Sequence, residues 1–370
     1  MKVINSKRRI ILIIDNLTRG GAQRQAFFLA KGLGERGHKV LVLALNDDAD
    51  SHNVASMASV AEVEVIGKLR LGLGLGPIGL WLRLRAWRPD VILTMLEFSD
   101  LLGRIAAHLY GRGSVVTSIR GRNLHKRAWW LWLDRWTMGW ADRVVFNSNA
   151  IVRGGQEREG VRPEQVCVIT NGIEVSDVNT KPVDRKTIGI RAGARILLTV
   201  GRLSPEKRFD TLLEAIALLP ADVDLLVAGT GPLRSALGEQ ASGLGLAERI
   251  HFLGLRGDVP ALLALAEVFV LPSAWEGMPN VVMEGMAAGC PVVATRIDGN
   301  VELLPDSSYG WLVEPGQPAQ LAAALAEALG DRSEAQQRAR RAKARALAEY
   351  SVDQMVRRYE ALFDQLAVAT

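Results

Sequence analysis

Two series of alternating strand and helix signals constrain the fold of this chain more than any other feature. Short runs of Val, Ile and Leu recur, and longer helical stretches such as 22–33 and 100–110 separate them. The runs are Ile10 to Ile14, 40–45, 91–94, 115–119 and 144–146, then 196–200, 225–228, 250–253, 268–271 and 292–295. Such alternation predicts a parallel sheet with helices on both faces. Because the series stops and restarts, we expect two doubly wound, Rossmann-like α/β domains that face each other across a cleft at the carboxyl ends of their strands.

A polar segment marks the boundary between the two series. Residues 174–194 lack sustained periodicity, so we predict an N-terminal domain of residues 1–175 and a C-terminal domain of residues 176–349. Residues 334–367 contain no Pro or Gly and are predicted to be mostly helical. Their last part, within 350–370, is expected to pack back on the N-terminal domain.

Composition and charge limit the possible partners. Hydrophobic residues make up 48% and charged residues 23% of the chain, which are values typical of globular proteins. The two cysteines provide no disulfide framework and have no metal-ligand neighbours, as expected for a protein of the reducing cytoplasm. Residues 1–175 carry 25 Lys and Arg against 16 Asp and Glu, a balance of +9, whereas the remainder carries 20 against 24, a balance of −4. The basic half favours phosphate groups, a membrane surface or nucleic acid. Nucleic acid is disfavoured because the basic residues are scattered.

The segment 268–295 carries the strongest functional signal. It has the pattern of a strand, a Gly/Pro loop, a helix and a second strand, with Glu276 in the loop and Glu284 inside the helix that starts near Asn280. A helix start attracts phosphate through its N–H groups, and carboxylates accept hydrogen bonds from hydroxyls. The segment therefore predicts a site for a sugar nucleotide.

Each half also has a glycine loop after its first strand. Gly20 and Gly21 follow the first strand of the chain, and Gly201 follows the first strand of the second half. Adjacent glycines let the backbone approach a ligand closely. Arg202 and Lys207, in the second loop, are suited to a diphosphate. Either loop alone is equally consistent with a tight connection.

Together these motifs resemble a known family. Glu276 to Glu284, followed by 286–295, resembles the acidic motif of the retaining glycosyltransferases of family 4, which have the GT-B fold. Further marks occur in the order of that family: Gly20-Gly21, Asn171-Gly172-Ile173, Gly201-Arg202 through Lys207, Gly229-Thr-Gly231-Pro232, Phe252-Leu253-Gly254, and Asp298-Gly299 through Glu302.

The resemblance implies a role for each matching residue. Arg202 and Lys207 would hold the donor diphosphate and stabilise charge on the leaving group, and Glu276 would accept hydrogen bonds from the transferred sugar. Glu284 would bind the ribose. The residues implied in donor binding are Gly20, Gly21, Gly201, Gly231, Gly277, Met278, Pro279, Asn280, Val281 and Glu284. The departing phosphate would help to deprotonate the attacking hydroxyl, so no carboxylate nucleophile is needed.

One position departs from the common family pattern. Many members have a His after the fourth strand of the first domain, where this chain has Ser118-Ile119-Arg120 and resembles a subset with Ser-x-Arg. Arg120 stays protonated and cannot serve as a base, so Arg120 and Asn123 are expected to bind the acceptor or a phosphate.

A tryptophan stripe leaves two interpretations open. Five of the nine tryptophans lie between 129 and 140, and Trp129, Trp132, Trp136 and Trp140 share one helical face. The first and favoured interpretation is a helix packed on the first sheet. The second is a membrane-facing helix, with headgroups bound by Arg122, Lys126, Arg127 and Arg135. The uncharged, glycine-rich segment 71–82 is too short to span a bilayer and could be a loop or dip into one interface.

The resemblance and the residues together predict a retaining glycosyltransferase. It would move a hexosyl or N-acetylhexosaminyl group from a UDP- or GDP-sugar to a hydroxyl of a lipid-linked or membrane glycan, in bacterial polysaccharide or lipopolysaccharide synthesis. It would work as a peripheral protein at the inner face of the cytoplasmic membrane. No tightly bound cofactor is expected, and chemistry without a metal is favoured. The alternatives are a sugar-nucleotide epimerase on the same fold and a catalytically silent sugar-nucleotide or membrane-binding protein.

Overall fold

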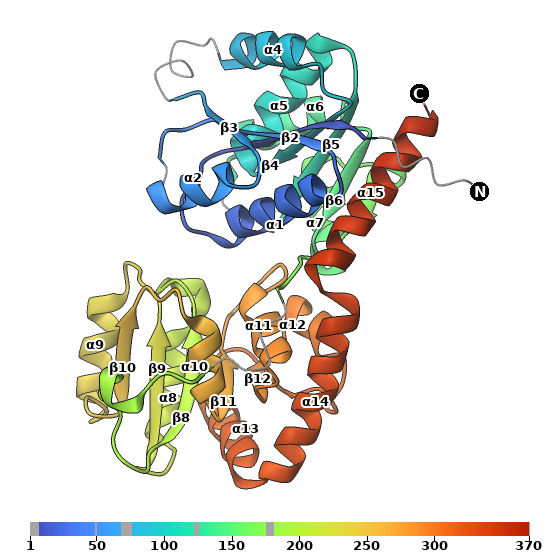
Figure 1. Ribbon diagram of the computed structural model, residues 1–370. Coiled ribbons are helices and arrows are strands. Elements are labelled where there is room, and N and C mark those ends of the chain that lie inside the picture. The colour runs from blue at the N-terminus through green and yellow to red at the C-terminus, as the bar shows by residue number, and fades with distance from the viewer. Residues whose placement is uncertain (1–6, 49, 68–75, 122–125, 175–180, 370) are drawn as a thin grey trace. The chain divides into compact units, whose positions relative to one another are not determined.

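The computed structural model describes residues 7–48, 50–67, 76–121, 126–174 and 181–369 (Figure 1). Asn123, one of the two predicted acceptor-side residues, lies outside them. The chain divides into two compact units: unit 1 comprises residues 1–172 and 352–370, and unit 2 comprises 173–351. The divisions fall within three residues of the predicted boundaries at 175 and 349. The predicted cleft concerns the placement of one unit against the other and stays a prediction.

Unit 1 is built on a seven-stranded parallel sheet with the order β3-β2-β1-β4-β5-β6-β7. The strands are β1 (Arg9–Ile14), β2 (Lys39–Ala44), β3 (Glu62–Val65), β4 (Val91–Met95), β5 (Ser114–Ile119), β6 (Arg143–Phe146) and β7 (Val166–Val168). The order reverses between β1 and β4, and this is the point where a doubly wound sheet leaves a crevice at the carboxyl ends of its strands.

Helices cover both faces of this sheet because the central strands are apolar on both sides. The helices are α1 (Gly21–Glu35), α2 (Ser51–Ala58), α4 (Gly76–Trp87), α5 (Glu97–Tyr110), α6 (Ala128–Met138), α7 (Val152–Glu159) and α15 (Val352–Ala369). On one face, Ile10, Leu12 and Ile14 of β1 pack in a core with α1 and α15. On the other face, Ile11 and Ile13 pack in a core with α4 and α5. Helix α6 lies beside α5.

Unit 2 repeats the plan with a six-stranded parallel sheet of order β10-β9-β8-β11-β12-β13. Its strands are β8 (Arg195–Val200), β9 (Val223–Ala228), β10 (Ile250–Gly254), β11 (Val268–Leu271), β12 (Val292–Thr295) and β13 (Trp311–Val313). Its helices are α8 (Phe209–Ala217), α9 (Arg234–Gly243), α10 (Val259–Leu265), α11 (Asn280–Ala288), α12 (Asp298–Leu303), α13 (Pro318–Gly330) and α14 (Arg332–Glu349). The two doubly wound domains predicted from the sequence are thus confirmed.

Helix α15 returns the end of the chain to unit 1. Met355, Val356, Tyr359 and Phe363 are buried in the core that also contains α1. The contact is close: a Cβ on Gly32 of α1 would lie 2.5 Å from a methyl of Val356. The predicted single helical stretch is divided in two by Tyr350 and Ser351, between α14 and α15.

A buried ionic network joins α5 and α6 beneath the sheet of unit 1. The Arg104 guanidinium donates to Asp134 at 2.6 Å and to the Thr137 hydroxyl at 3.1 Å. Lys126 lies 2.8 Å from Asp134 and 3.4 Å from Glu159, with 1% of its side chain exposed. Burial opposes the charge on Lys126, but Glu159 and Asp134 outweigh it and raise its pKa. The hypothesis that Lys126 meets lipid headgroups is therefore wrong, because its ammonium group is held inside the protein.

Asp100 belongs to the same buried region and is expected to make stability depend on pH. Burial raises the pKa of Asp100 to about 8, although Arg104 and the Thr94 hydroxyl oppose the shift. Between about pH 4 and 8 the folded chain therefore holds a proton that the unfolded chain releases, so the free energy of unfolding falls as pH rises. Asp100→Asn removes this titration. We expect urea unfolding to show the variant gaining on the wild type from about pH 5 to about pH 8. A stability difference that is the same at both pH values would contradict the assignment.

Candidate functional site

The predicted donor-site residues of unit 2 gather at the carboxyl ends of β8 and β11. These two strands are neighbours in the sheet although two strands and three α-helices separate them in sequence, because the strand order reverses between them. The loop after β8 carries Arg202 and Lys207, and the loop after β11 carries Glu276. The backbone joins the two loops directly, since the N–H of Ala274 donates to the carbonyl of Glu206 at 2.8 Å.

Close backbone packing fixes the first of these loops. The N–H of Leu203 donates to Thr230, and the Leu203 carbonyl accepts from Leu233 at 3.0 Å. A Cβ on Gly229 would lie 1.9 Å from the Gly201 carbonyl oxygen, and one on Gly231 would lie 2.4 Å from that of Leu203. Only glycine permits this approach. Gly229 and Gly231 therefore support the 201–207 loop. Packing alone explains why position 231 needs a glycine, whether or not Gly231 also makes its predicted donor contact.

Lys207 and Glu276 form an ion pair across the two loops. The side chains are 17% and 14% exposed, so both charges lie largely out of water. Glu276 also accepts a hydrogen bond of 2.8 Å from the hydroxyl of Ser273, which is buried at the end of β11. An acid and a base are thus held at one point, where the acid can accept from hydroxyls and the base can bind phosphate. Arg202 lies nearby in sequence and is exposed.

The acidic motif leads into α11 through a tightly packed turn. Gly277 meets the start of α12: a Cβ on Gly299 would lie 2.3 Å from the Gly277 carbonyl oxygen. Met278 is buried, and Pro279 precedes the first residue of the helix, Asn280. Within the described residues, no side chain caps this helix and its first turn holds no acid. Its N–H groups and dipole therefore favour an anion at that end.

Glu284 and Val281 occupy the first turns of α11 and are partly exposed. Val282, Met283 and Met286 on the same helix are buried in the core of unit 2. The helix therefore points its apolar side into the core and leaves the predicted ribose ligand, Glu284, on its partly exposed side.

In unit 1, the predicted Gly20 and Gly21 form the entrance to α1. Gly20 is extended, and the helix begins at Gly21 without a side-chain cap among the described residues. The preceding loop is held by Asn16, whose side-chain oxygen accepts from Thr18 at 2.8 Å and from Gln23 at 2.9 Å. The neighbouring helix start, that of α5, is capped by Asp15, which accepts from the N–H of Ser99 at 2.7 Å. Burial raises the pKa of Asp15.

Arg120 lies at the carboxyl end of β5, where it already has protein partners. It donates to the Asn171 side-chain oxygen at 2.7 Å and to the Tyr359 hydroxyl of α15 at 3.4 Å. Its Nε is buried and lacks a hydrogen-bond partner among the described atoms. Gln25 of α1 bonds both backbone groups of Gly172 at 2.8 Å. The Asn171-Gly172 motif therefore fastens the end of unit 1, and the acceptor role of Arg120 stays a prediction.

The sequence did not single out several residues that shape the donor loops. Ser273 holds Glu276, and its carbonyl accepts from the hydroxyl of Thr295. Asn300 of α12 is buried and donates to the Thr295 carbonyl at 2.8 Å. The position of Ser273 two residues after the apolar strand β11 was an available signal, because polar residues at strand ends often line sites in parallel sheets.

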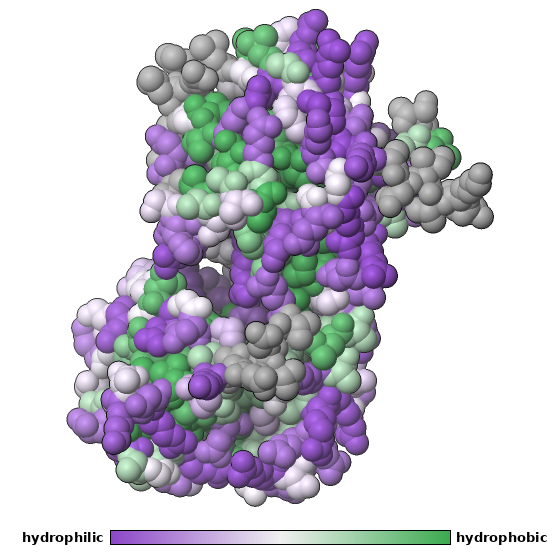
Figure 2. Space-filling model, in the orientation of Figure 1, coloured by the Kyte–Doolittle hydropathy of each residue, from purple (hydrophilic) through white to green (hydrophobic). Residues whose placement is uncertain are grey.

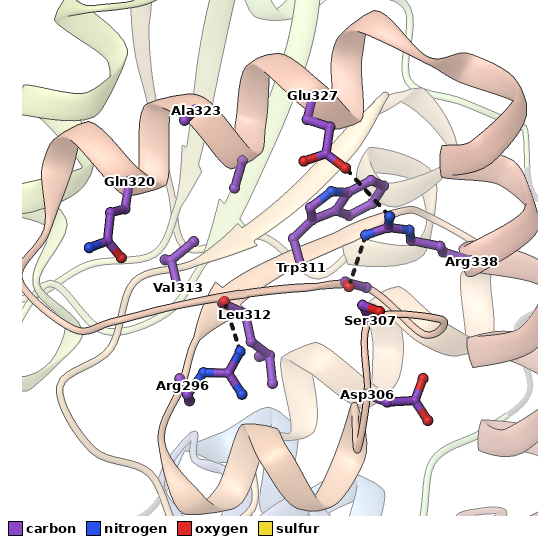
Figure 3. Close-up of a pocket in the computed structure, with 12 residues that line it drawn as sticks. Arg296, Asp306, Ser307, Trp311, Leu312, Val313, Gln320, Ala323, Glu327 and Arg338 are labelled. Atoms are coloured by element: carbon purple, nitrogen blue, oxygen red, sulfur yellow. Dashed lines mark hydrogen bonds and ion pairs between the residues drawn. The ribbon is translucent and has the colours of Figure 1, made fainter.

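A separate cavity of about 470 Å³ opens elsewhere in unit 2 (Figure 3). It lies between β13, α13 and the start of α14 and contains none of the predicted site residues. Arg338 is one of its lining residues and lies 4.1 Å over the Trp311 ring, with an ion pair to Glu334 at 2.8 Å. The cavity is therefore separate from the candidate site at the β8 and β11 loops.

Family models match both halves of the chain. The model described as Glycosyltransferase Family 4 matches residues 19–177, and that described as Glycosyl transferases group 1 matches residues 180–345. The two parallel-sheet units define the GT-B fold, and the two models define a glycosyltransferase. The chain belongs to glycosyltransferase family 4.

Curated relatives match part of the chain. It is 29% identical over 254 residues to UDP-Gal:alpha-D-GlcNAc-diphosphoundecaprenol alpha-1,3-galactosyltransferase of Escherichia coli, covering 64% of this chain and 65% of the relative. It is 36% identical over 151 residues to the lipopolysaccharide core biosynthesis glycosyltransferase LpsE of Rhizobium meliloti, covering 41% and 44%. The chain thus spans less than two thirds of the length of these relatives.

A solved structure matches nearly the whole chain. Anabaena Alr3699/HepE in complex with UDP and glucose is 25% identical, with a TM-score of 0.82, covering 96% of this chain and all of that one. The similarity supports the fold assigned to both units.

The packing of Gly231 gives a stability prediction. Gly231→Ala would place a Cβ 2.4 Å from the Leu203 oxygen, and we expect it to lower the free energy of unfolding by about 1–3 kcal/mol and to displace the 201–207 loop. The matched control is Gly243→Ala at the end of α9, where a Cβ meets nothing within 4 Å. Urea unfolding of both variants tests the difference, and equal stability would show that the loop yields without cost.

Proposed function

We propose that this chain transfers a hexosyl or N-acetylhexosaminyl group from a UDP- or GDP-sugar to a hydroxyl of a lipid-linked or other membrane glycan, with retention of configuration. The observation that carries the proposal is the Lys207–Glu276 pair at the point where the strand order of unit 2 reverses. Two relatives support it: the Escherichia coli enzyme is named for a diphosphoundecaprenol-linked sugar, and the Anabaena structure holds UDP and glucose.

The donor would replace the ion pair with contacts of its own. Lys207 and Arg202 would meet the diphosphate, and Glu276 would turn to hydroxyls of the transferred sugar. The N–H groups at Met278 to Val281 would bind phosphate oxygens, and Glu284 would accept from the ribose. Each charge that loses its protein partner therefore gains a ligand partner, so donor binding leaves neither of them buried and unpaired.

The acceptor would bind to unit 1, with Arg120 and Asn123 on its side of the reaction. The attacking hydroxyl would pass its proton to the departing phosphate on the same face of the sugar, so configuration is retained. We propose that the reaction needs neither a bound metal nor a tightly bound cofactor, and that the protein works as a peripheral protein on the cytoplasmic side of a bacterial membrane.

Donor identity and the role of Glu276 can be tested together. We expect one of the UDP-, GDP- or ADP-sugars to raise the melting temperature, because a ligand stabilises the state that binds it.

Glu276→Gln keeps a hydrogen-bond acceptor for Ser273 but removes the negative charge that would accept hydrogen bonds from the sugar hydroxyls. Acceptor-dependent release of the nucleotide should fall about 10²- to 10³-fold in this variant.

The control for this experiment is an ion pair of unit 2 away from the loops. Glu267 is 40% exposed and lies 2.8 Å from Arg195, so Glu267→Gln removes the same charge at a distance from the site. Its turnover should match the wild type. Near-normal turnover in Glu276→Gln would defeat the residue assignment, and a change of the sugar in the absence of any acceptor would identify an epimerase instead.

The Gly20 turn offers a test that separates ligand approach from folding. A Cβ on Gly20 would meet only the end of the flexible Gln23 side chain, at 2.4 Å, and the backbone there is extended. Gly20→Ala should therefore melt within about a degree or two of the wild type, while a ligand that approaches the backbone there is obstructed and transfer falls at least about tenfold. Wild-type kinetics in the variant would remove Gly20 from the site.

A further inference from the structure

Helices α4, α5 and α6 expose an unusual number of large apolar side chains on one face of unit 1. Trp129, Trp132 and Trp136 of α6 are 56%, 65% and 58% exposed. We call the docking face the set formed by these tryptophans with Ile78 and Leu82 of α4 and Phe98 and Leu109 of α5, all of them at least half exposed. Figure 2 shows apolar residues at the surface where α4 lies in Figure 1.

The aromatic rings along α6 form two groups of contacting rings. Trp132 and Trp136 are stacked with centroids 6.3 Å apart, Trp136 meets Trp140 at 5.0 Å, and Trp140 stacks on His108 of α5 at 4.1 Å. At the other end of the helix, Trp130 meets Phe98 at 4.9 Å. Within each group the contacts hold the rings against one another although their outer sides remain in water.

The fully exposed charges carried by α4, α5 and α6 themselves are cationic, although exposed acids such as Glu62 and Glu157 lie on the neighbouring β3 and α7. All residues of α4, α5 and α6 are described, and their acids are Glu97, which is half-buried, and Asp100 and Asp134, which are buried. The exposed charged side chains on or beside the three helices include Arg85, Arg127 and Arg135. Exposed aromatic rings beside these cationic side chains complement a surface that is both apolar and anionic.

A bilayer interface has this chemistry. Tryptophan rings favour the headgroup region, where the ring is buried among acyl chains and the indole N–H meets water, and each cation near an anionic leaflet adds to the attraction. Among the described residues, no helix is long and apolar enough to cross a membrane. The docking face has the chemistry suited to lying on a bilayer surface.

The place of the docking face in the fold connects it to the predicted site. Phe98 lies at the start of α5, directly after β4, and Trp129 lies at the start of α6, after β5. The carboxyl edge of the sheet, which also carries the Gly20 turn after β1, thus adjoins one end of the docking face. A bilayer on this face would lie beside the edge of the sheet where we propose that the acceptor binds.

We propose that the docking face binds the surface of an anionic lipid bilayer, with the α6 tryptophans among the headgroups and Arg85 and Arg127 on the lipid phosphates. The idea that this binding brings a lipid-linked acceptor within reach of the site rests on the proposed function. Vesicle binding itself needs neither donor nor acceptor, so the two ideas can fail separately.

The experiment is vesicle flotation of the full chain. Vesicles of phosphatidylglycerol and phosphatidylethanolamine should carry the wild type, with a blue shift of tryptophan fluorescence, and phosphatidylcholine vesicles should carry far less. The triple variant Trp129→Ser, Trp132→Ser, Trp136→Ser should bind at least about tenfold more weakly. Because these side chains are more than half exposed, its melting temperature and its nucleotide-sugar binding should stay at wild-type values.

Matched controls keep the result specific to this face. Leu218→Ser with Leu255→Ser removes exposed apolar groups from unit 2, and Arg340→Glu with Arg341→Glu changes exposed charges there. Both pairs should bind vesicles like the wild type, whereas Arg85→Glu with Arg127→Glu should lose the preference for anionic lipid. Unchanged flotation of the Trp variant would overturn the proposal. Absence of vesicle binding by the wild type would also overturn it. If the wild type then forms dimers and the Trp variant does not, the docking face binds a second copy of the chain instead.

Discussion

The loop after β8, residues 201–207, depends on the close approach of two glycines, Gly229 and Gly231, to its backbone. Gly229 and Gly231 lie so close to Gly201 and Leu203 that no side chain fits between them. The contact sets where the chain leaves β8, and so it sets where Lys207 meets Glu276 from β11. A pair held in this way would lose little conformational freedom in the proposed exchange of its partner for a ligand, because the backbone that carries it is already fixed.

Unit 1 uses the same kind of constraint for a different purpose. Gly172 packs against α15, where a Cβ would lie 2.8 Å from the Val352 backbone, and Gln25 satisfies both of its backbone polar groups. The chain leaves unit 1 at this glycine and re-enters it at Val352. A motif that in sequence looks like one more functional mark therefore has a structural explanation, and Arg120 belongs to it through Asn171.

The central strands could be predicted from the sequence because their residues are apolar on both faces, as in β1, β4, β8 and β11. Three edge strands, β3, β7 and β13, were missed because each has only three or four residues. In β3, Glu alternates with Val, whereas β7 and β13 are apolar but too short to predict a strand. The loops of the candidate site were predictable from motif spacing. The Lys207–Glu276 contact was not, since it joins residues 69 apart whose meeting depends on strand order.

In helix α6, the spacing of the tryptophans does not predict which face of the helix is buried. The four-tryptophan stripe has the spacing of a core face, and the interpretation favoured from sequence, packing on the sheet, is wrong for Trp129, Trp132 and Trp136. The inward side of the helix instead presents Asp134, Thr137 and Met138.

The reason lies in the neighbouring helix. Arg104 of α5 is fully buried and needs a partner, as does the Lys126 ammonium, and leaving either charge unpaired inside the protein would cost several kcal/mol. Asp134 satisfies both and so must face inward, which rotates the tryptophans outward. A hydrophobic stripe predicts the buried face of a helix only where no buried charge on an adjacent element needs a partner from that helix. Such a charge belongs to the tertiary structure, so the spacing of the stripe cannot indicate it.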